Sequence, residues 1–172
     1  MSTVPALATI AVGVVVERSK AASPWIDFVW RPVTVLAGQP DTAPWTQLSA
    51  DGDSTTFYAG PAEIALYRTE TTYYRDNLAT GAPRLWVALR STGVEPPYEV
   101  FAVTADPAEG EALTEAGNDL VDVVPMPPAV RAAVEAFVAE HHVDRPFVKR
   151  KRDRADPEAL GRRVPLAKER DR

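Results

Sequence analysis

Few residue types in this chain could support metal binding or covalent catalysis. The chain has no cysteine, which excludes disulfides, thiolate zinc sites and cysteine nucleophiles. Its two histidines, His141 and His142, are adjacent. Neighbouring side chains on a helix diverge by about 100°, so this pair is poorly placed to hold one ion. The sequence therefore predicts no metal centre.

Acidic residues are the other group that could do chemistry. General acid–base catalysis needs a positioned pair of carboxyl groups, one of them with a pKa raised by burial. Six acids lie instead among turn and helix-start residues, where solvated carboxylates are normal: Asp106, Glu109, Glu111, Glu115, Asp119 and Asp122. We expect no catalytic residues and no cofactor. The sequence leaves the question of an enzyme open and favours a protein without catalytic activity.

Tryptophans give the strongest candidate for a binding surface. The stretch SPWIDFVWRPVTVL, residues 23–36, contains Trp25 and Trp30, and Trp45 follows. We expect Trp30 to pack into the core, while Trp25 and Trp45 flank an exposed edge that contacts a partner. Proline removes backbone donors, so this edge should recognise a partner through side chains more than by accepting an added strand. Four prolines interleave it, at positions 24, 32, 40 and 44.

Charge divides the chain into an acidic body and a basic end. Residues 1–144 have a net charge of −11 and residues 145–172 a net charge of +6. We predict that the basic end docks onto a partner protein through Phe147, Lys149, Arg150, Lys151 and Arg152. A solvated tail and a nucleic-acid-binding arm remain alternatives. No aromatic residue interleaves the basic run to stack on bases, and nucleic-acid binding would weaken steeply with salt.

Arginines of the body support a different, cofactor-binding interpretation. The segment Leu36-Ala37-Gly38 is followed by Gln39-Pro40-Asp41, which lacks the further glycines and the cation of a phosphate-binding loop. A pyrophosphate group would instead need several arginines that converge in one cleft. The candidates are Arg68, Arg75 and Arg84.

The elements that must position these residues are mostly strands. Valine-rich and alternating stretches predict strands over residues 8–16, 26–36, 45–48, 55–58, 62–70, 83–89 and 98–104. The last two should be antiparallel neighbours. Pro32 favours an edge position or a bulge for the strand that contains it. Residues 71–78 could form a helical turn.

Two further helices complete an α+β domain. Asp106 is a good N-cap for a short helix with Pro107 at its first position. A long C-terminal amphipathic helix over residues 128–142 has the apolar stripe Val130, Val134, Phe137, Val138 and His141. We expect a curved, mainly antiparallel sheet or a partly open barrel packed by this helix. Residues 1–146 would form one domain, and residues 147–172 a basic, solvated docking tail.

The chain shows no signal for a membrane. No apolar run approaches the roughly 20 residues that a membrane span needs. The N-terminal stretch MSTVPALATIAVGVVVERSK has no basic residue before its apolar part, where a secretory signal would carry one. We therefore expect a cytoplasmic protein that does not contact a membrane.

Five segments of the chain, taken together, are characteristic in order and spacing. They are VGVVVERSKAASPWIDFVWRPVTVL, TTFYAGPAEIALYRTETTYYRDNL, PRLWVALR, PPYEVFAVTADPAEGEALTEAG and RPFVKRKRDRADPEALGRR. With them the chain resembles an uncharacterised proteobacterial family, the domain-of-unknown-function family 3305, from about Ile10 to about Arg163.

Members of that family are typically encoded beside molybdenum- or tungsten-dependent formate dehydrogenases and their maturation factors. The resemblance therefore implies a non-catalytic accessory protein or small subunit that binds a formate dehydrogenase subunit or a maturation factor. One alternative is a protein that binds or transfers the molybdenum cofactor, a pterin dinucleotide. A second alternative is a nucleic-acid-binding module that uses the basic tail.

Overall fold

A computed structural model describes residues 4–117, 119–146 and 148. Its larger antiparallel sheet contains β1 (Ala8–Lys20), β2 (Phe28–Ala37), β3 (Thr46–Asp51) and β4 (Ser54–Leu66), in the order β2-β1-β4-β3. The smaller antiparallel sheet contains β5 (Arg84–Ser91), β6 (Tyr98–Thr104) and β7 (Asp119–Pro125), in the order β6-β5-β7. The helical elements are the 3₁₀ turn η1 (Arg68–Glu70), α1 (Thr71–Ala79), α2 (Pro107–Glu115) and α3 (Pro128–His141).

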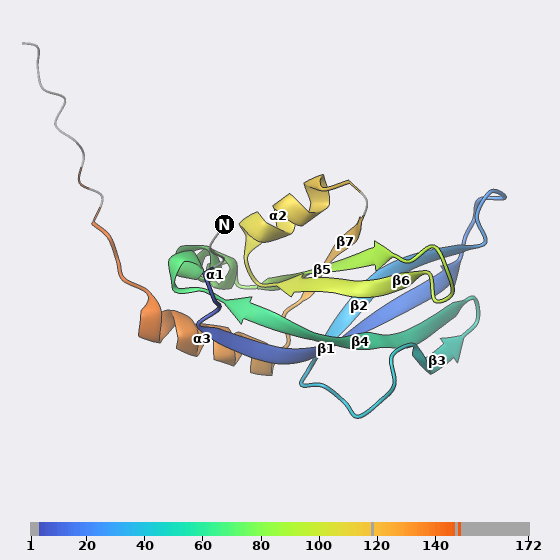
Figure 1. The fold of residues 1–172 in the computed structure, drawn as a ribbon, viewed down its shortest axis with the longest axis horizontal. Coiled ribbons are helices and arrows are strands. Elements are labelled where there is room, and N and C mark those ends of the chain that lie inside the picture. The colour runs from blue at the N-terminus through green and yellow to red at the C-terminus, as the bar shows by residue number, and fades with distance from the viewer. Residues whose placement is uncertain (1–3, 118, 147, 149–172) are drawn as a thin grey trace, which may run out of the picture. The chain divides into compact units, whose positions relative to one another are not determined.

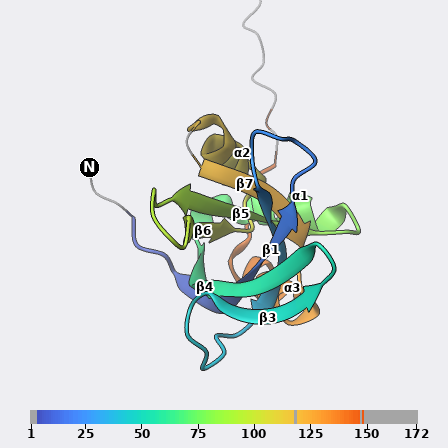
Figure 2. The same ribbon diagram turned by 90° about the vertical axis from the view of Figure 1, so that its right-hand side faces the viewer.

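The two sheets enclose one apolar core. Strand β2 contacts β7 and β4 contacts β6, so the sheets meet along two seams, and Figure 2 shows them as separate layers. In the described part of the chain, backbone ladders pair strands only within each sheet, so no closed barrel forms. Valine-rich β1 is the centre of the larger sheet, and its residues 12–16 are all buried. A continuous run of valines suits a strand that is covered on both faces.

Several sequence predictions for the strands are confirmed. Strands β5 and β6 are antiparallel neighbours. Pro32 lies on β2, an edge strand of its sheet, and the pairing register shifts there, since Val15 pairs with Thr34 but Val16 pairs with Pro32. Proline has no backbone N–H to donate to a ladder, which is why it is found at such edges and bulges.

Other strand boundaries were predicted wrongly. Residues 55–58 and 62–66 belong to one strand, β4, whereas residues 68–70, predicted as the end of a strand, form η1. Gly60 does not end the strand. It adopts a φ of +145° at a register shift opposite β1, because glycine tolerates the backbone bend of a bulge. Strand β7 was not predicted at all.

The C-terminal helix α3 packs on the core as expected but is shorter than predicted. It has 14 residues, so the expectation of a long helix is wrong. Of the predicted stripe, Val130, Val134 and Phe137 are buried, and α3 contacts α1. The short helix α2 begins as predicted, since the Asp106 carboxylate accepts a hydrogen bond from the backbone N–H of Ala108 at 2.8 Å.

Buried Tyr74 gives the fold a pH dependence that can be measured. Its hydroxyl accepts a hydrogen bond from the backbone N–H of Tyr67 at 3.0 Å, and its ring packs against Phe137. Burial raises the pKa of Tyr74 from 10.0 to about 12, although the bond from Tyr67 opposes this shift. The unfolded chain therefore loses this proton first. The stability due to Tyr74 is complete below pH 10 and falls between pH 10 and about 12.

We expect Tyr74→Phe to flatten this decline. At pH 7 the variant should lose about 1 kcal/mol of unfolding free energy through the missing hydrogen bond. Urea unfolding of both proteins from pH 8 to pH 11 measures the difference. Tyr58, whose pKa burial also raises, accounts for a decline that both proteins share. Parallel pH profiles for the two proteins would contradict the prediction.

Candidate interaction surface

Three hairpin connections gather at one end of the body, opposite α1 and α3 (Figure 1). They are the β1–β2 loop over residues 21–27, the β3–β4 turn at residues 52–53 and the β5–β6 loop over residues 92–97. The end of β1 is joined to the β3–β4 turn by a hydrogen bond from the backbone N–H of Lys20 to the carbonyl of Asp53 at 3.0 Å. We call this region the loop end.

An aromatic cluster fills the inside of the loop end. Trp30 on β2 lies 5.9 Å, centre to centre, from the rings of both Trp45 and Phe57 and 6.2 Å from the ring of Tyr98. These rings come from both sheets, so they link the two sheets at the loop end. Trp30 packs against the core, as predicted, with its side chain partly buried.

Trp45 lies inside this cluster rather than at an exposed edge. Its side chain is partly buried and packs against the core, with its ring edge-on to that of Trp30 at 81°. Its backbone N–H donates to the carbonyl of Tyr58, and its φ of +67° is in the left-handed region, which is unfavourable for a bulky side chain. The indole nevertheless packs in the cluster, and the residue directly precedes β3.

Trp25 is placed very differently, at the surface of the β1–β2 loop. Its side chain is 90% exposed, and its backbone N–H donates to the Ser23 hydroxyl at 3.2 Å. Ile26, Phe28 and Val29, which follow it along the chain, are also exposed. Four large apolar side chains within five residues therefore face solvent at the loop end.

Arg18 connects the exposed and the packed aromatic residues. It pairs with Trp30 across the β1–β2 ladder and with Thr55 across the β1–β4 ladder. Its guanidinium carbon lies 4.5 Å from the ring centre of Phe28, 5.3 Å from that of Phe57 and 5.7 Å from that of Trp30. Three rings thus hold this cation in place by cation–π attraction.

The alternating register of the strands separates the charges near Arg18. Glu17 and Arg31 are also paired across β1 and β2, and their side chains form an ion pair at 2.9 Å. Because neighbouring residues of a strand point to opposite faces, this ion pair lies on the face opposite Arg18. Sequence reasoning missed Arg18, although the alternation of Val16, Arg18 and Lys20 could have placed it beside Phe28 and Trp30.

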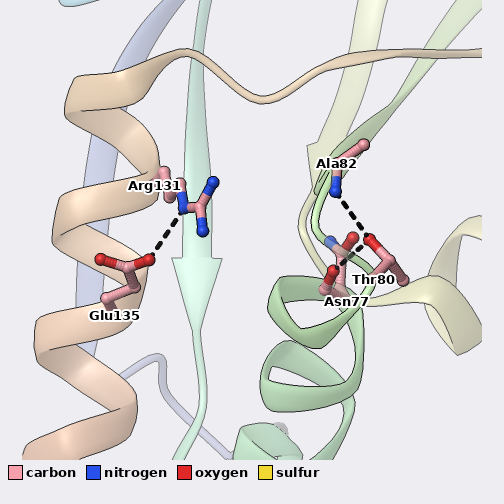
Figure 3. A network of polar contacts seen from close by, with 5 residues as sticks. All are labelled: Asn77, Thr80, Ala82, Arg131 and Glu135. Atoms are coloured by element: carbon pink, nitrogen blue, oxygen red, sulfur yellow. Dashed lines mark hydrogen bonds and ion pairs between the residues drawn. The ribbon is translucent and has the colours of Figure 1, made fainter.

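The arginines proposed for a pyrophosphate lie on separate elements. Arg68 is on η1, and Arg75 on α1 is 2.9 Å from the His142 Nε2. Arg84 begins β5 and lines a hollow of about 350 Å³ together with Arg131 of α3. Arg68 and Arg75 are not among the described residues that line this hollow. Arg131 itself bonds to Glu135 through Nε and Oε1 at 2.8 Å, as Figure 3 shows.

The two histidines have local partners. The His141 ring packs on Phe137, with 4.6 Å between ring centres, and the His142 Nδ1 is 3.0 Å from the Thr71 hydroxyl. Within the described residues, no three histidines or carboxylates cluster as metal ligands would. The predicted docking residues Phe147, Lys149, Arg150, Lys151 and Arg152 lie outside the described residues.

The fold and this surface define an α+β domain of two antiparallel sheets with an aromatic and partly exposed loop end. The chain belongs to a family described as "Protein of unknown function (DUF3305)", whose model matches residues 11–151. No curated protein matches the chain, and no solved structure matches it. None of the helices in the described residues has the length and apolar character to cross a membrane.

Proposed function

We propose that this protein is a non-catalytic accessory protein or small subunit of a molybdenum- or tungsten-dependent formate dehydrogenase system, and that it acts in the cytoplasm by binding another protein. The partner, a formate dehydrogenase subunit or a maturation factor, is suggested by the resemblance of the sequence. The binding mode is suggested by the surface. In this proposal the loop end contacts the partner, together with the basic segment from Phe147 onward.

The observation that carries this proposal is the exposure of Trp25. A tryptophan that is 90% exposed keeps a large apolar surface in water, and burial in a partner releases that water. Exposed apolar residues are ordinary when scattered, but contiguous groups mark interaction sites. Tryptophan is also, with tyrosine and arginine, enriched among the residues that dominate binding energy. Trp25 meets the second criterion, and the exposed side chains of Ile26 and Phe28 near it along the chain bear on the first.

Trp25→Ala is expected to leave the fold intact and to weaken partner binding by about tenfold, since truncating an aromatic anchor commonly costs more than about 1 kcal/mol. The side chain is almost fully exposed, so the unfolding free energy should change by less than about 0.5 kcal/mol. The test is a pull-down of the tagged chain from its native cytoplasm, with bound proteins and extracted cofactors identified by mass spectrometry.

Tyr73→Ala is the matched control. Tyr73 is an aromatic residue on α1 that is 43% exposed, and α1 lies at the end opposite the loops (Figure 1). Recovery of a formate dehydrogenase subunit by the wild type and by Tyr73→Ala, but not by Trp25→Ala, would support the proposal. Equal recovery by all three proteins would contradict it.

One observation favours the cofactor-binding alternative, namely that Arg84 and Arg131 line the same hollow. Its fit to a pterin dinucleotide is poor. The hollow of about 350 Å³ is near the lower end of the roughly 300–1,000 Å³ typical of small-molecule sites. The charge of Arg131 is also partly neutralised by Glu135. Recovery of a pterin dinucleotide on the isolated chain, lost in Arg84→Gln, would favour this alternative.

A further inference from the structure

We propose that Arg18 determines what the loop end recognises, by binding a carboxylate on an acidic side chain of the partner protein. The acidic residue would lie beside an apolar residue that packs on Trp25 and Phe28. This inference rests on the proposed function, because it assumes that the loop end binds a protein. It adds the chemistry of the partner's binding segment.

The geometry of Arg18 suits this role. A guanidinium group is flat, and its five N–H donors lie in its plane. The ring centres of Phe28, Phe57 and Trp30 lie 4.5–5.7 Å from the guanidinium carbon. These contacts hold the group in place and leave its N–H donors available for hydrogen bonds. An arginine that stacks on aromatic rings has already lost much of its side-chain freedom, so an acceptor that binds it pays less of that entropy.

Arg18 has no acceptor of its own in the described part of the chain. No hydrogen bond or ion pair joins its guanidinium to another described residue, whereas Arg31, Arg90 and Arg131 each pair with a carboxylate. Asp27 and Asp53 lie in the loop end, but neither carboxylate forms an ion pair with Arg18. The Arg18 side chain is half-buried. If a partner covers it, its N–H donors lose water, and an acceptor on the partner avoids the cost of leaving them unpaired.

Charge complementarity identifies the ligand as an anion. By register, Lys20 lies on the same face as Arg18 and pairs with Phe28, while Glu17 lies on the opposite face with Arg31. The inner face at the loop end therefore has two cations among aromatic rings. A carboxylate fits the planar guanidinium of an arginine through two parallel hydrogen bonds. The apolar residue beside that carboxylate in the partner would pack on Trp25.

A protein is a better source of this anion than a nucleic acid. Residues 1–144 have a net charge of −11, which repels a polyanion over a long range. A single carboxylate within an apolar segment is repelled much less by this net charge, and it interacts mainly with the nearby cations and aromatic rings. The exposed residues Trp25, Ile26 and Phe28 provide more apolar contact than a phosphate would use.

The test uses random 12-residue peptides displayed on phage and selected on the full-length protein. We expect the wild type to select peptides in which Asp or Glu adjoins Leu, Phe or Trp. The best peptide is then synthesised with its acid and with the matching amide, Glu→Gln or Asp→Asn. Replacing the acid should weaken binding to the wild type by about tenfold, as is typical of a charge-assisted hydrogen bond.

Protein variants complete a double-mutant cycle. Arg18→Gln should weaken binding of the acidic peptide by about tenfold and should abolish its advantage over the amide peptide. Arg18→Lys should recover only part of the affinity, because a lysine lacks the planar fork. Arg31→Gln is the matched control, an exposed arginine on the other face, and should bind both peptides as the wild type does. Thermal unfolding checks that each variant is folded.

Several outcomes would overturn the inference. Selection without enrichment of acids, no selection at all, or an acid preference that survives in Arg18→Gln would each do so. Competition of inorganic phosphate at millimolar concentration, or self-association lost in Arg18→Gln, would assign the site to a phosphate or to a second copy instead. If Trp25→Ala loses the partner while the peptide cycle shows no coupling, the proposed function stands and this inference alone fails.

Discussion

Replacing Asn77 with alanine is expected to lower the free energy of unfolding by about 3 kcal/mol. Asn77 on α1 is 4% exposed. Its Nδ2 donates to the carbonyls of Arg84 and Ala105 at 2.8 and 3.0 Å, and its Oδ1 accepts from the N–H of Arg84 at 3.0 Å. One side chain thus joins α1 to the start of β5 and the end of β6.

The expected size follows from what alanine leaves behind. Each buried backbone group that loses its partner costs about 1–3 kcal/mol. The bond to Ala105 is fully buried, whereas the two bonds to Arg84 are only partly buried, so water can replace part of those two. The backbone of Asn77 is also held, because its carbonyl accepts from the Thr80 hydroxyl at 2.8 Å (Figure 3). This bond helps to fix the position of the Asn77 side chain in the folded protein.

Urea denaturation at pH 7 measures this prediction. Asp76→Ala is the control, since Asp76 is the exposed neighbour on the same helix and should change stability by less than about 0.5 kcal/mol. Asn77→Asp keeps an acceptor for the N–H of Arg84 but turns a carboxylate toward two carbonyls, so it should be no more stable than Asn77→Ala. A loss in Asn77→Ala no larger than that in Asp76→Ala would refute the structural role.

Local patterns were sufficient for features that depend on neighbouring residues. The helix stripe of Val130, Val134 and Phe137 follows from a period of 3.6 residues, and the N-cap at Asp106 from a side chain that reaches two residues ahead. Pro32 predicted an edge strand or a bulge because proline has no N–H to donate to a neighbouring strand, whichever strand that is. Each of these features is determined within one turn or one strand.

Features that depend on distant pairing could not be predicted in the same way. Asn77 finds Ala105 across 28 residues, and no periodicity in the chain indicates that contact. Strand β7 was missed because Asp119 and Asp122 interrupt its apolar residues, although the strand pairs along its full length with β5. An edge strand tolerates such acids on its exposed positions.

The loop end shows the same limit. Its tryptophans were identified from composition, but the separation of Trp45 in the cluster from Trp25 in solvent depends on how the two sheets meet. Arg18 lies over Phe28 and Trp30 only because the bulge near Pro32 sets the register of β1 against β2. A shift by one residue would send Arg18 to the opposite face.

The largest steric effect is expected at Gly110 on α2, where Gly110→Ala should lower the free energy of unfolding by about 2 kcal/mol. A Cβ at this position would lie 2.2 Å from Cγ and 2.4 Å from Cδ1 of Trp86. The contact is at the base of the indole, which cannot swing away as a flexible chain end would. Helix α2 must move from β5 or Trp86 must leave its position.

Two opposing terms determine the net change. Alanine favours a helix over glycine by about 1 kcal/mol, while overpacking in a close contact typically costs about 1–3 kcal/mol and sometimes more. The short distances place this contact at the upper end of that range, so the steric term should exceed the gain. The helix is otherwise well anchored, since the N–H of Gly110 donates to the carbonyl of Asp106 at 3.0 Å.

Two companion variants separate the steric effect from backbone effects. Gly81→Ala places the same methyl group where no atom lies within 4 Å, but at a φ of +80°, and should lose only about 1 kcal/mol through the left-handed conformation. In Trp86→Ala, a further Gly110→Ala change should be neutral or stabilising, because the clash is gone and the helix preference remains. If Gly110→Ala alone proved as stable as the wild type in urea, the close packing of α2 on β5 would be disproved.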